Sequence, residues 1–282
     1  MKAALIHRYG SNDQVCVADI SVPVMGAMDL LVRVHAASVN PLDGKTRAGK
    51  LKTLLKYRFP LVLGNDLSGV VSDVGERVTH FKKGDAVYAR LDKDRIGTFA
   101  EFAVVREGAA ALKPTNLTFE AAASLPLVAL TAWQALVEIG KVGAKQRVLI
   151  HAGSGGVGSV AIQLARHLGA TVFTTVGRRN LELVKRLGAD VAIDYRSAHF
   201  EDVAKDCDVV LDSAGGDTNA RYEYLFMRAD GAQLREITWL VERGVIKPLV
   251  DKVFPLEQVR DALAYSESGR ATGKVVIKVA HN

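Results

Sequence analysis

The residues best suited to chemistry in this sequence are three glycines, Gly153, Gly155 and Gly158, in the spacing G-x-G-x-x-G. A bound pyrophosphate needs free backbone N–H groups at the start of a helix and no side chains in its way. In this interpretation Gly153 allows a tight turn, Gly155 lets the phosphates approach the backbone, and Gly158 lets the helix pack against the preceding strand. The motif predicts that a dinucleotide binds along Gly153, Ser154, Gly155, Gly156, Val157 and Gly158.

The elements that must position these glycines are predicted on both sides of them. Val148–Ile150 is a short apolar run, typical of a strand buried on both faces. Behind the glycines, apolar residues recur at helical intervals, at Val160, Ile162, Leu164, Ala165 and Leu168. A strand, a glycine turn and a helix in that order are the context that a dinucleotide-binding motif requires. The alternative is a glycine-rich turn that binds no ligand.

Two other glycine motifs do not match this turn. A P-loop needs Lys after the last glycine, where Ser159 stands. A nucleophile elbow needs Gly at position 152, which is Ala152.

The next strand, Thr171–Val176, is followed by two arginines instead of a carboxylate. An NAD site usually has Asp or Glu about 20 residues after the glycines, to bind the ribose hydroxyls. The residues after this strand include Arg178 and Arg179, whose guanidinium groups can bind a 2′-phosphate through charge-assisted hydrogen bonds. These residues predict NADPH as the cofactor. The alternative is that both arginines belong to an ordinary solvated start of a helix.

Length and composition indicate a globular protein with two domains and no membrane span. The chain has 282 residues, 49% of them hydrophobic, and charges or glycines interrupt every apolar run. The first residues, Met1–Arg8, are charged too early for a signal peptide and predict a first strand. Two cysteines far apart, Cys16 and Cys207, indicate a reducing compartment, so we expect a cytoplasmic protein.

The net charge of +6 requires nucleic acid to be considered as a partner. Lys and Arg are scattered, and no basic run is longer than Arg178-Arg179. This distribution favours an enzyme that binds small anions over a nucleic-acid-binding protein.

The first part of the chain is rich in short strand-like runs separated by Gly, Pro and Asp. They are Ala3–Ile6, Leu30–Val34, Val70–Val74, Ala86–Tyr88 and Phe99–Val105, and they predict a barrel-like β unit. From Thr118 the pattern becomes helical, over 120–123 and 127–139.

After the glycine turn, strands and helices alternate, which predicts a parallel sheet with helices on both faces and an α/β fold. The predicted strands are 171–176, 191–193 and 209–211, and the predicted helices are 181–187, 200–204, 232–241 and 256–265. Residues 274–279 predict a closing strand that returns to the first domain. The stretch 212–223 is too short for another strand–helix unit. We therefore expect a sheet that is cut short, or a segment missing near 213–223.

Several motifs in one order resemble the medium-chain dehydrogenase/reductase superfamily, in its zinc-free quinone oxidoreductase (zeta-crystallin-like) branch. Within that branch the sequence is most similar to the NADPH-dependent alkenal/enone reductases. The matching stretches are Ala37–Asp43, Leu63–Gly69, Phe81–Asp85, Gly97–Glu101, Leu130–Trp133, Ala152–Gly158 and Gly269–Lys274.

The resemblance implies a GroES-like substrate domain over 1–118, completed by 245–282, and a Rossmann domain over 119–244. It places the active cleft between them and implies a homodimer that pairs through the edge of the Rossmann sheet. Relatives have a longer Rossmann domain, which agrees with a missing segment near 213–223.

The positions that hold zinc in other branches resemble Asn40 and Gly64-Asn65-Asp66 here. They offer neither Cys nor His, so no metal is expected. The reaction is then expected to depend on hydride from the cofactor and on a proton from solvent or a polar side chain.

The resemblance also implies roles for individual residues. Lys45, Asn40 and Asp43 belong to a loop that faces the nicotinamide, and Lys45 is the expected contact for the cofactor or the substrate carbonyl, where enolate charge develops. The alternative is that Lys45 is a surface lysine and that Asp43 caps a helical turn. Thr131 is expected to lie beside the nicotinamide, and the alternative is that it only packs within its helix. Tyr195 is expected to lie near the adenosine phosphate. Weaker candidates for lining the cleft are Tyr57 and Tyr88.

The predicted function is zinc-independent transfer of hydride from NADPH to a quinone or to the activated double bond of an α,β-unsaturated carbonyl. Two alternatives stay open. One is an NADPH-binding protein with little turnover, in a structural or RNA-binding role. The other is an enoyl-thioester reductase of the same fold.

Overall fold

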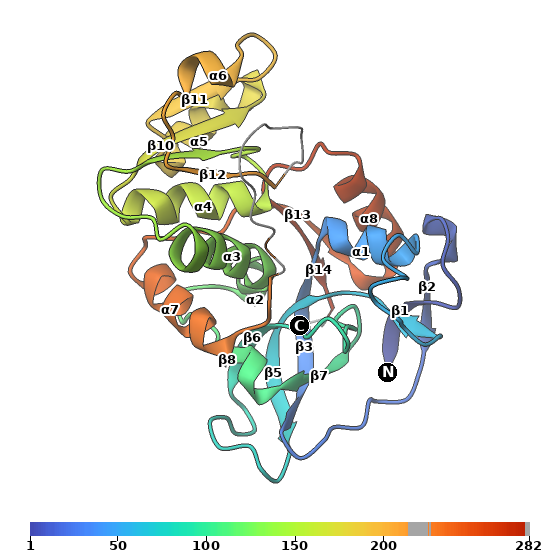
Figure 1. Cartoon of the computed structure of the whole chain (residues 1–282). Coiled ribbons are helices and arrows are strands. Elements are labelled where there is room, and N and C mark those ends of the chain that lie inside the picture. The colour runs from blue at the N-terminus through green and yellow to red at the C-terminus, as the bar shows by residue number, and fades with distance from the viewer. Residues whose placement is uncertain (214–224, 226, 280–282) are drawn as a thin grey trace.

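We describe residues 1–213, 225 and 227–279 of a computed structural model of the chain. Most of the buried hydrophobic side chains form two large clusters, one from residues 4–110 and 256–279 and one mainly from 111–246. Figure 1 shows the corresponding two parts, a β-rich part that contains the N-terminus and a layered part built around α3 to α5. No helix within the described ranges has the length and apolar character of a membrane span.

The first part is built on two groups of strands, which are antiparallel apart from the pair of β13 and β14. Three strands pair in the order β2-β1-β4, and a larger sheet has the order β13-β14-β3-β5-β6-β8, with β7 also paired to β3. The strands are β1 (Lys2–Ile6), β2 (Cys16–Asp19), β3 (Asp29–Val39), β4 (Leu61–Val62), β5 (Asp66–Val74), β6 (Ala86–Arg90), β7 (Phe102–Arg106), β8 (Ala110–Leu112), β13 (Val250–Pro255) and β14 (Lys274–Lys278). Every strand predicted in this half of the chain is present.

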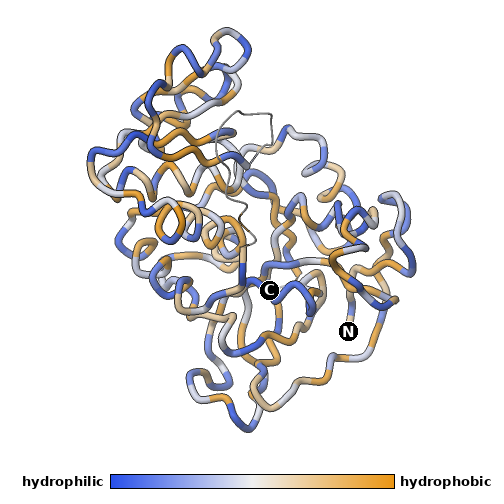
Figure 2. The backbone as a smooth tube through the Cα atoms, in the orientation of Figure 1, coloured by the Kyte–Doolittle hydropathy of each residue, from blue (hydrophilic) through white to orange (hydrophobic). Residues whose placement is uncertain are grey.

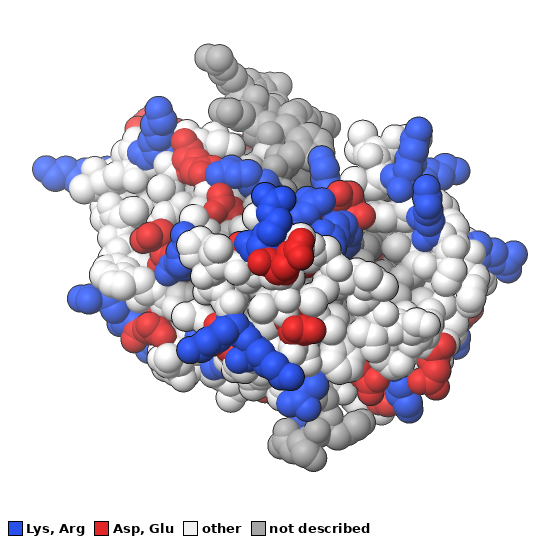
Figure 3. Space-filling model, turned by 90° about the horizontal axis from the view of Figure 1, so that it is seen from below, with Lys and Arg blue, Asp and Glu red and all other residues white. Residues whose placement is uncertain are grey.

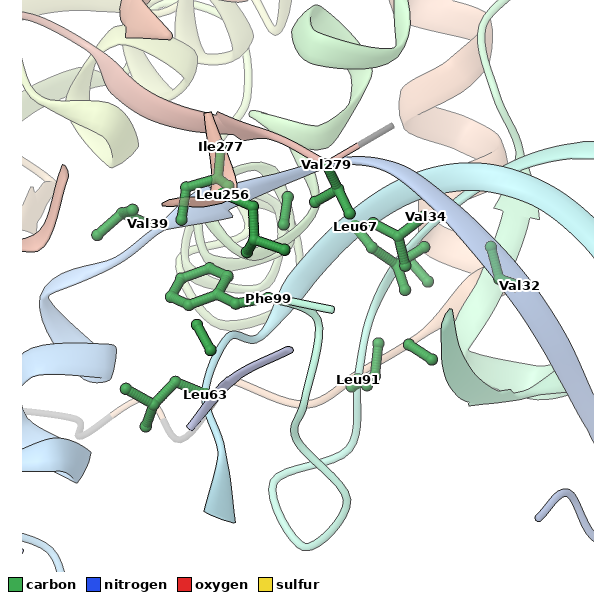
Figure 4. Close-up of a cluster of buried hydrophobic side chains, with 14 of the residues drawn as sticks. Val32, Val34, Val39, Leu63, Leu67, Leu91, Phe99, Leu256, Ile277 and Val279 are labelled. Carbon is green, nitrogen blue, oxygen red and sulfur yellow. The ribbon is translucent and has the colours of Figure 1, made fainter. Parts of the chain in front are cut away.

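The core of this part comes from the alternation of side chains along its strands. Leu30, Val32 and Val34 of β3 point to one face and are fully buried. Figure 4 shows the buried cluster around Phe99, in which residues from the two ends of the chain pack together.

The predicted return of the C-terminus is confirmed, because β14 pairs antiparallel with β3, with Ile277 opposite Ala37. The strand β13 was not predicted. It pairs parallel with β14 after a crossover that contains α8 (Val259–Glu267). The sheet therefore joins residues more than 200 positions apart.

The second part holds a parallel sheet of the order β11-β10-β9-β12. Its strands are β9 (Arg147–Ile150), β10 (Thr171–Val176), β11 (Val191–Asp194) and β12 (Val209–Leu211). The helices are α1 (Pro41–Arg47) in the first part, then α2 (Phe119–Ala123), α3 (Pro126–Trp133) with a π-helical continuation over Gln134–Ile139, α4 (Gly156–His167), α5 (Leu181–Leu187), α6 (Phe200–Val203) and α7 (Gly231–Glu242). Short 3₁₀ turns occur at Asn12–Gln14, Glu107–Ala109, Arg178–Asn180 and Leu256–Gln258.

This order is that of the first four strands of a doubly wound nucleotide-binding sheet. Figure 2 shows that hydrophobic residues, drawn in orange, are frequent along its strands, as expected for a sheet covered by helices on its faces. Within the described ranges the sheet ends at β12. The segment predicted to be missing near 213–223 falls almost entirely on residues outside those ranges.

The two clusters support the predicted domain limits, which we retain as a proposal: 1–118 with 245–282, and 119–244. Thr118 caps α2, and its side chain accepts a hydrogen bond from the Ala121 N–H. Three buried residues of the predicted first domain pack into the second cluster instead, namely Tyr88 of β6, Ala111 of β8 and Ile246.

Candidate active site between the two cores

In the glycine turn, the residue with a strained backbone conformation is not one of the predicted glycines. Ala152 has a φ of +53°, in the left-handed region, whereas Gly153 does not. Gly153 is required for a different reason, since a Cβ there would overlap the hydroxyl of Thr174, which donates to the Ile150 carbonyl. Gly153 therefore packs closely on β10, and its role in the tight turn stays a prediction.

The other two glycines of the motif have different surroundings. A Cβ on Gly158 would lie 2.7 Å from the Cα of Gly153, so the start of α4 fits closely on the turn. A Cβ on Gly155 would meet only the Ala152 carbonyl oxygen, at 3.2 Å. Gly155 is the N-cap of α4 and has no side chain that could cap this end. The first N–H groups of α4 are therefore available to a ligand.

A cavity of about 1100 Å³ lies over this turn and the carboxyl end of β10. Of the predicted cofactor contacts, Ser154, Gly155, Arg178, Arg179 and Tyr195 line it. The other predicted contacts, Gly153, Gly156, Val157, Gly158 and Thr131, are not in its lining. The hydroxyl of Thr131 instead donates to the Leu127 carbonyl at 2.7 Å, as its packing alternative expected.

Four arginines surround one end of the cavity, namely Arg178, Arg179, Arg196 and Arg270. None of the ion pairs found among the described residues includes any of them. Unpaired guanidinium groups around one opening favour an anionic ligand.

Arg270 is a cavity residue that the sequence did not single out. It reaches the turn because the Gly273 N–H donates to the Ser154 carbonyl at 2.8 Å, which brings the segment before β14 across the cavity. A guanidinium nitrogen of Arg179 donates to the Arg270 carbonyl at 3.1 Å. No local signal in the sequence links residues 154 and 273, because only the fold brings them together.

His151, at the end of β9, also lines the cavity. Its Nδ1 lies 3.0 Å from the Thr175 hydroxyl, and its ring meets Phe200 edge-on. Burial lowers the pKa of this imidazole. A neutral ring therefore forms part of the cavity wall.

A second group of polar residues lies where α1 begins. Asn40 and Asp43 form a capping box, in which the Asn40 N–H donates to the Asp43 carboxylate at 2.7 Å. The Asn65 amide donates to the other oxygen of Asp43 at 2.8 Å. Asn40 and Asp43 are both 1% exposed. Asp43 therefore caps the start of α1, which was the alternative to a catalytic role.

Asp66 connects this group to the second part of the molecule. Its carboxylate accepts hydrogen bonds from Ser38, from the Asn40 amide at 2.9 Å and from the Leu127 N–H at the start of α3 at 3.0 Å. A carboxylate at the N-terminus of a helix is stabilised by the helix dipole. Asp66 therefore fixes α3 against β5.

Lys274, at the start of β14, completes the group, which we call the polar cluster: Ser38, Asn40, Asp43, Asn65, Asp66 and Lys274. Its ammonium donates to the Asn40 amide oxygen at 2.5 Å and to the Val39 carbonyl at 2.8 Å, and it lies 4.0 Å from Asp66. Its stem runs beside the glycine turn, since a Cβ on Gly156 would lie 2.9 Å from Lys274 Cδ.

Burial dominates the electrostatics of the polar cluster. It raises the pKa of Asp43 to about 6, against the lowering effect of hydrogen bonds from Asn40 and Asn65. It also raises the pKa of Asp66 and lowers that of Lys274. Both acidic groups and the ammonium are thus held in an environment that penalises charge.

The remaining predicted site residues lie apart from this cluster. Lys45 is exposed in the last turn of α1 and does not line the cavity, as its surface alternative expected. Tyr88 is fully buried and donates to the Leu234 carbonyl of α7, so its predicted place in the cleft lining is wrong. Tyr57 is half-buried, and its hydroxyl donates to the Lys93 carbonyl.

Comparisons with known proteins agree with this architecture. Residues 26–115 match the alcohol dehydrogenase GroES-like domain, and 156–234 and 217–277 match zinc-binding dehydrogenase domains. The 2-methylene-furan-3-one reductase of Solanum lycopersicum is 38% identical over 98% of this chain and 79% of its own length. This chain belongs to the medium-chain dehydrogenase/reductase superfamily.

Two further members of the superfamily resemble it closely. The chloroplastic NADPH-dependent alkenal/one oxidoreductase of Arabidopsis thaliana is 37% identical over 98% of this chain and 79% of its own length. The solved quinone oxidoreductase from Coxiella burnetii superposes with a TM-score of 0.91 at 32% identity, over 99% of both chains.

The positions that hold zinc in other branches of the superfamily form the hydrogen-bonded polar cluster here. Asn40 and Asn65 present amides there, and the Lys274 ammonium contacts Asn40. In the part of the chain that the structure describes, no three His, Cys, Asp or Glu residues group in a way that could hold a metal ion.

The alignment with the Solanum reductase is longer than this chain. It extends over 308 positions, more than the 282 residues of this chain. That relative therefore has residues with no counterpart here.

Proposed function

We infer that this superfamily member is a zinc-independent oxidoreductase that binds NADPH and reduces a quinone or the activated double bond of an α,β-unsaturated carbonyl. The observation that carries this inference is the cavity bounded by an uncapped helix N-terminus on one side and four unpaired arginines on the other. A dinucleotide with an additional phosphate on its adenosine ribose complements both features. Relatives named as alkenal/one and quinone oxidoreductases support the acceptor class.

The residues that hold the cofactor are assigned from the cavity lining. Ser154 and Gly155, with the N–H groups at the start of α4, bind the pyrophosphate, and Gly153, Gly156, Val157 and Gly158 shape the turn. Arg178, Arg179, Tyr195 and Arg270 bind the 2′-phosphate. Bound NADPH supplies a hydride with its electron pair. Thr131 is retained as a predicted neighbour of the nicotinamide.

We assign the polar cluster to the other side of the glycine turn, where the stem of Lys274 lies beside Gly156. Asn40 is fixed between Lys274 and Asp66, so its amide has one orientation. Asp43 is held by the cap of α1 and by Asn65. The three predicted catalytic residues are thus divided between positioning roles for Asn40 and Asp43 and a surface position for Lys45.

The test measures oxidation of NADPH by its absorbance, with an alkenal, an enone, a para-quinone and an ortho-quinone as acceptors, each repeated with NADH. We expect turnover with NADPH well above that with NADH, and the preferred acceptor identifies the substrate. Tight binding of NADPH without oxidation by any acceptor would contradict the proposal.

We also propose a cytoplasmic homodimer. Cys16 and Cys207 are both free and partly buried, which fits a reducing compartment. Strand β12 has one strand neighbour among the described residues, and Val210 on it is exposed, which offers an edge for pairing. Figure 3 shows basic and acidic side chains interspersed on the face of the molecule that is seen from below Figure 1, which supports a small-molecule role over a nucleic-acid partner. Light scattering during gel filtration tests the dimer.

A further inference from the structure

Arg90 is a buried cation with no assigned role. It is the last residue of β6 and lies directly opposite Asp66 of β5 in the antiparallel pair. Residues opposite each other in such a pair project from the same face of the sheet. Arg90 therefore lies on the face that carries Asp66, and it is 4% exposed.

No described residue accepts a hydrogen bond or forms an ion pair with this guanidinium. Its Nε is buried and has no hydrogen-bond partner in the part of the chain that the structure describes. Tyr88, two residues earlier on the same face, is instead bonded to the Leu234 carbonyl and to Thr238. A buried cation without hydrogen bonds is costly, so a ligand that accepts hydrogen bonds would stabilise it.

The neighbouring carboxylates stabilise the charge of Arg90 but do not bind it. Burial lowers the pKa of the Arg90 guanidinium, and the charges of Asp66 and Asp43 oppose this effect. The oxygens of Asp66 are occupied by Ser38, Asn40 and Leu127, and those of Asp43 by Asn40 and Asn65. The guanidinium is thus kept charged and left free to bind another oxygen.

A second unpartnered atom lies beside this site. The Oδ1 atom of Asn65 is buried and has no hydrogen bond among the described residues. Its amide nitrogen donates to Asp43, which fixes the amide so that the oxygen faces elsewhere. The Leu91 N–H donates to the Asn65 carbonyl, so Asn65, which precedes β5, lies beside the end of β6 where Arg90 stands.

A series of contacts connects Arg90 to the cofactor turn. The stem of Lys274 lies against Gly156, and its ammonium reaches Asn40 and approaches Asp66. Asp66 is paired in register with Arg90. Three of the four cavity arginines, Arg178, Arg179 and Arg196, follow β10 and β11, whereas Lys274 connects the polar cluster to the turn at Gly156.

We propose that Arg90 binds the carbonyl oxygen of the acceptor, the atom on which negative charge develops during reduction. This inference rests on the proposed function and assigns to Arg90 the role that the sequence predicted for Lys45. A buried guanidinium stabilises such an oxygen better than an exposed ammonium, because water does not screen it.

The chemistry balances without a further reactant. A hydride adds with its electron pair to the conjugated carbon of the acceptor. The electrons of the carbon–carbon double bond shift, and the carbonyl π electrons move onto the oxygen to give an enolate, which Arg90 stabilises. A proton from solvent then adds to the neighbouring carbon and restores the carbonyl group.

The first test compares Arg90→Met and Arg90→Lys with Arg33→Met, which removes an exposed arginine from β3 of the same sheet. We expect Arg90→Met to lower kcat with an enone by about 100- to 1000-fold, the usual effect of losing one oxyanion donor. The affinity for NADPH should be unchanged in every variant. Arg90→Lys should recover part of the activity.

A second measurement is independent of turnover. 4-Nitrophenol is titrated with the protein, with and without NADP⁺, and the phenolate is followed by its absorbance. We expect wild type and Arg33→Met to lower the pKa of the bound phenol, and Arg90→Met to bind the phenolate at least about tenfold more weakly.

The outcomes separate the two proposals. Absence of turnover by wild type with any acceptor contradicts the proposed function, whereas equal turnover and phenolate binding by wild type and Arg90→Met contradict the role of Arg90 alone. If Arg90→Met does not fold, Arg90→Lys and Arg90→Gln decide. Phenolate binding by Arg90→Gln equal to that of wild type overturns the proposal.

Discussion

At the scale of single residues, the four arginines of the cavity and the polar cluster differ in how their charges are compensated. The arginines are positive groups without carboxylate partners at an opening. The polar cluster is a set of buried charges held by hydrogen bonds. The first arrangement suits recognition of an incoming anion, and the second suits a rigid wall.

Replacing both Arg178 and Arg179 by Ala should discriminate between the two nicotinamide cofactors. Each guanidinium can make hydrogen bonds to a charged phosphate, so the Kd for NADPH should rise by about 10- to 100-fold. The Kd for NADH should change little, because it lacks the phosphate. Fluorescence titration measures both values.

The matched control is Arg186→Ala, which removes an exposed arginine in the last turn of α5. Its Kd for both cofactors should equal that of wild type. An equal loss of NADPH and NADH affinity in the double variant would contradict the assignment of the 2′-phosphate to these arginines.

Asp43 should give a pH-dependent stability. Its pKa is about 6 in the folded protein, against 3.8 for a solvated aspartate side chain, so the folded state binds more protons between these values. By linkage, the free energy of unfolding contributed by Asp43 falls as pH rises through this window. Asp43→Asn should reduce that fall without abolishing it, since burial also raises the pKa of Asp66.

Thermal unfolding measures this effect between about pH 4 and pH 7, because this range contains the pKa of Asp43 in the folded protein. Asp261→Asn, at an exposed position on α8, is the control and should follow wild type. A parallel pH dependence for wild type and Asp43→Asn would show that Asp43 does not titrate in this range.

At the scale of elements, the turn between β9 and α4 depends on the absence of side chains. Gly158→Ala would place a Cβ against the backbone of Ala152 and Gly153, which cannot move as a flexible side chain can. We expect a loss of stability of about 1–3 kcal/mol, typical of overpacking, and weaker binding of NADPH. Urea unfolding and cofactor titration measure the two effects.

Gly143→Ala is the control for this prediction, because no atom lies near a Cβ at that position and its φ is not positive. It should unfold at the same urea concentration as wild type or slightly higher. If Gly158→Ala behaves like this control, α4 does not require the close approach.

At the scale of the whole molecule, the C-terminal strand closes the core of the N-terminal part. Ile277 is fully buried and packs in the cluster around Phe99. Ile277→Ala should lower the free energy of unfolding by about 2–5 kcal/mol, because a cavity remains in the core. Denaturant unfolding measures this loss.

The control for Ile277→Ala is Val253→Ala, which shortens an exposed aliphatic side chain on β13 of the same sheet. Val253→Ala should change stability by no more than about 0.5 kcal/mol. Similar losses in the two variants would mean that β14 is not part of the central core.

Sequence patterns with short periods predicted much of the element structure. The bounds of β10, β12 and α5 agree to the residue, because hydrophobic periodicity and glycine punctuation are local signals. The strand β13 was missed because it is an edge strand with mostly exposed or half-buried residues, so its hydropathy does not alternate with burial. The resemblance supplied the GroES-like and Rossmann domain organisation, the acceptor class and the positions at which zinc ligands would stand.

The sequence by itself determined the glycine turn, the paired arginines after β10, the α/β alternation and the family. Only the tertiary structure decided that Arg270 reaches the cavity, that Lys274 binds Asn40 and that Arg90 is buried without a partner among the described residues. Each of these facts depends on residues separated by 20 to more than 230 positions. Contacts between residues so far apart leave no periodic pattern in the local sequence. Chemistry carried by one loop was therefore predictable, whereas chemistry shared between strands followed from packing.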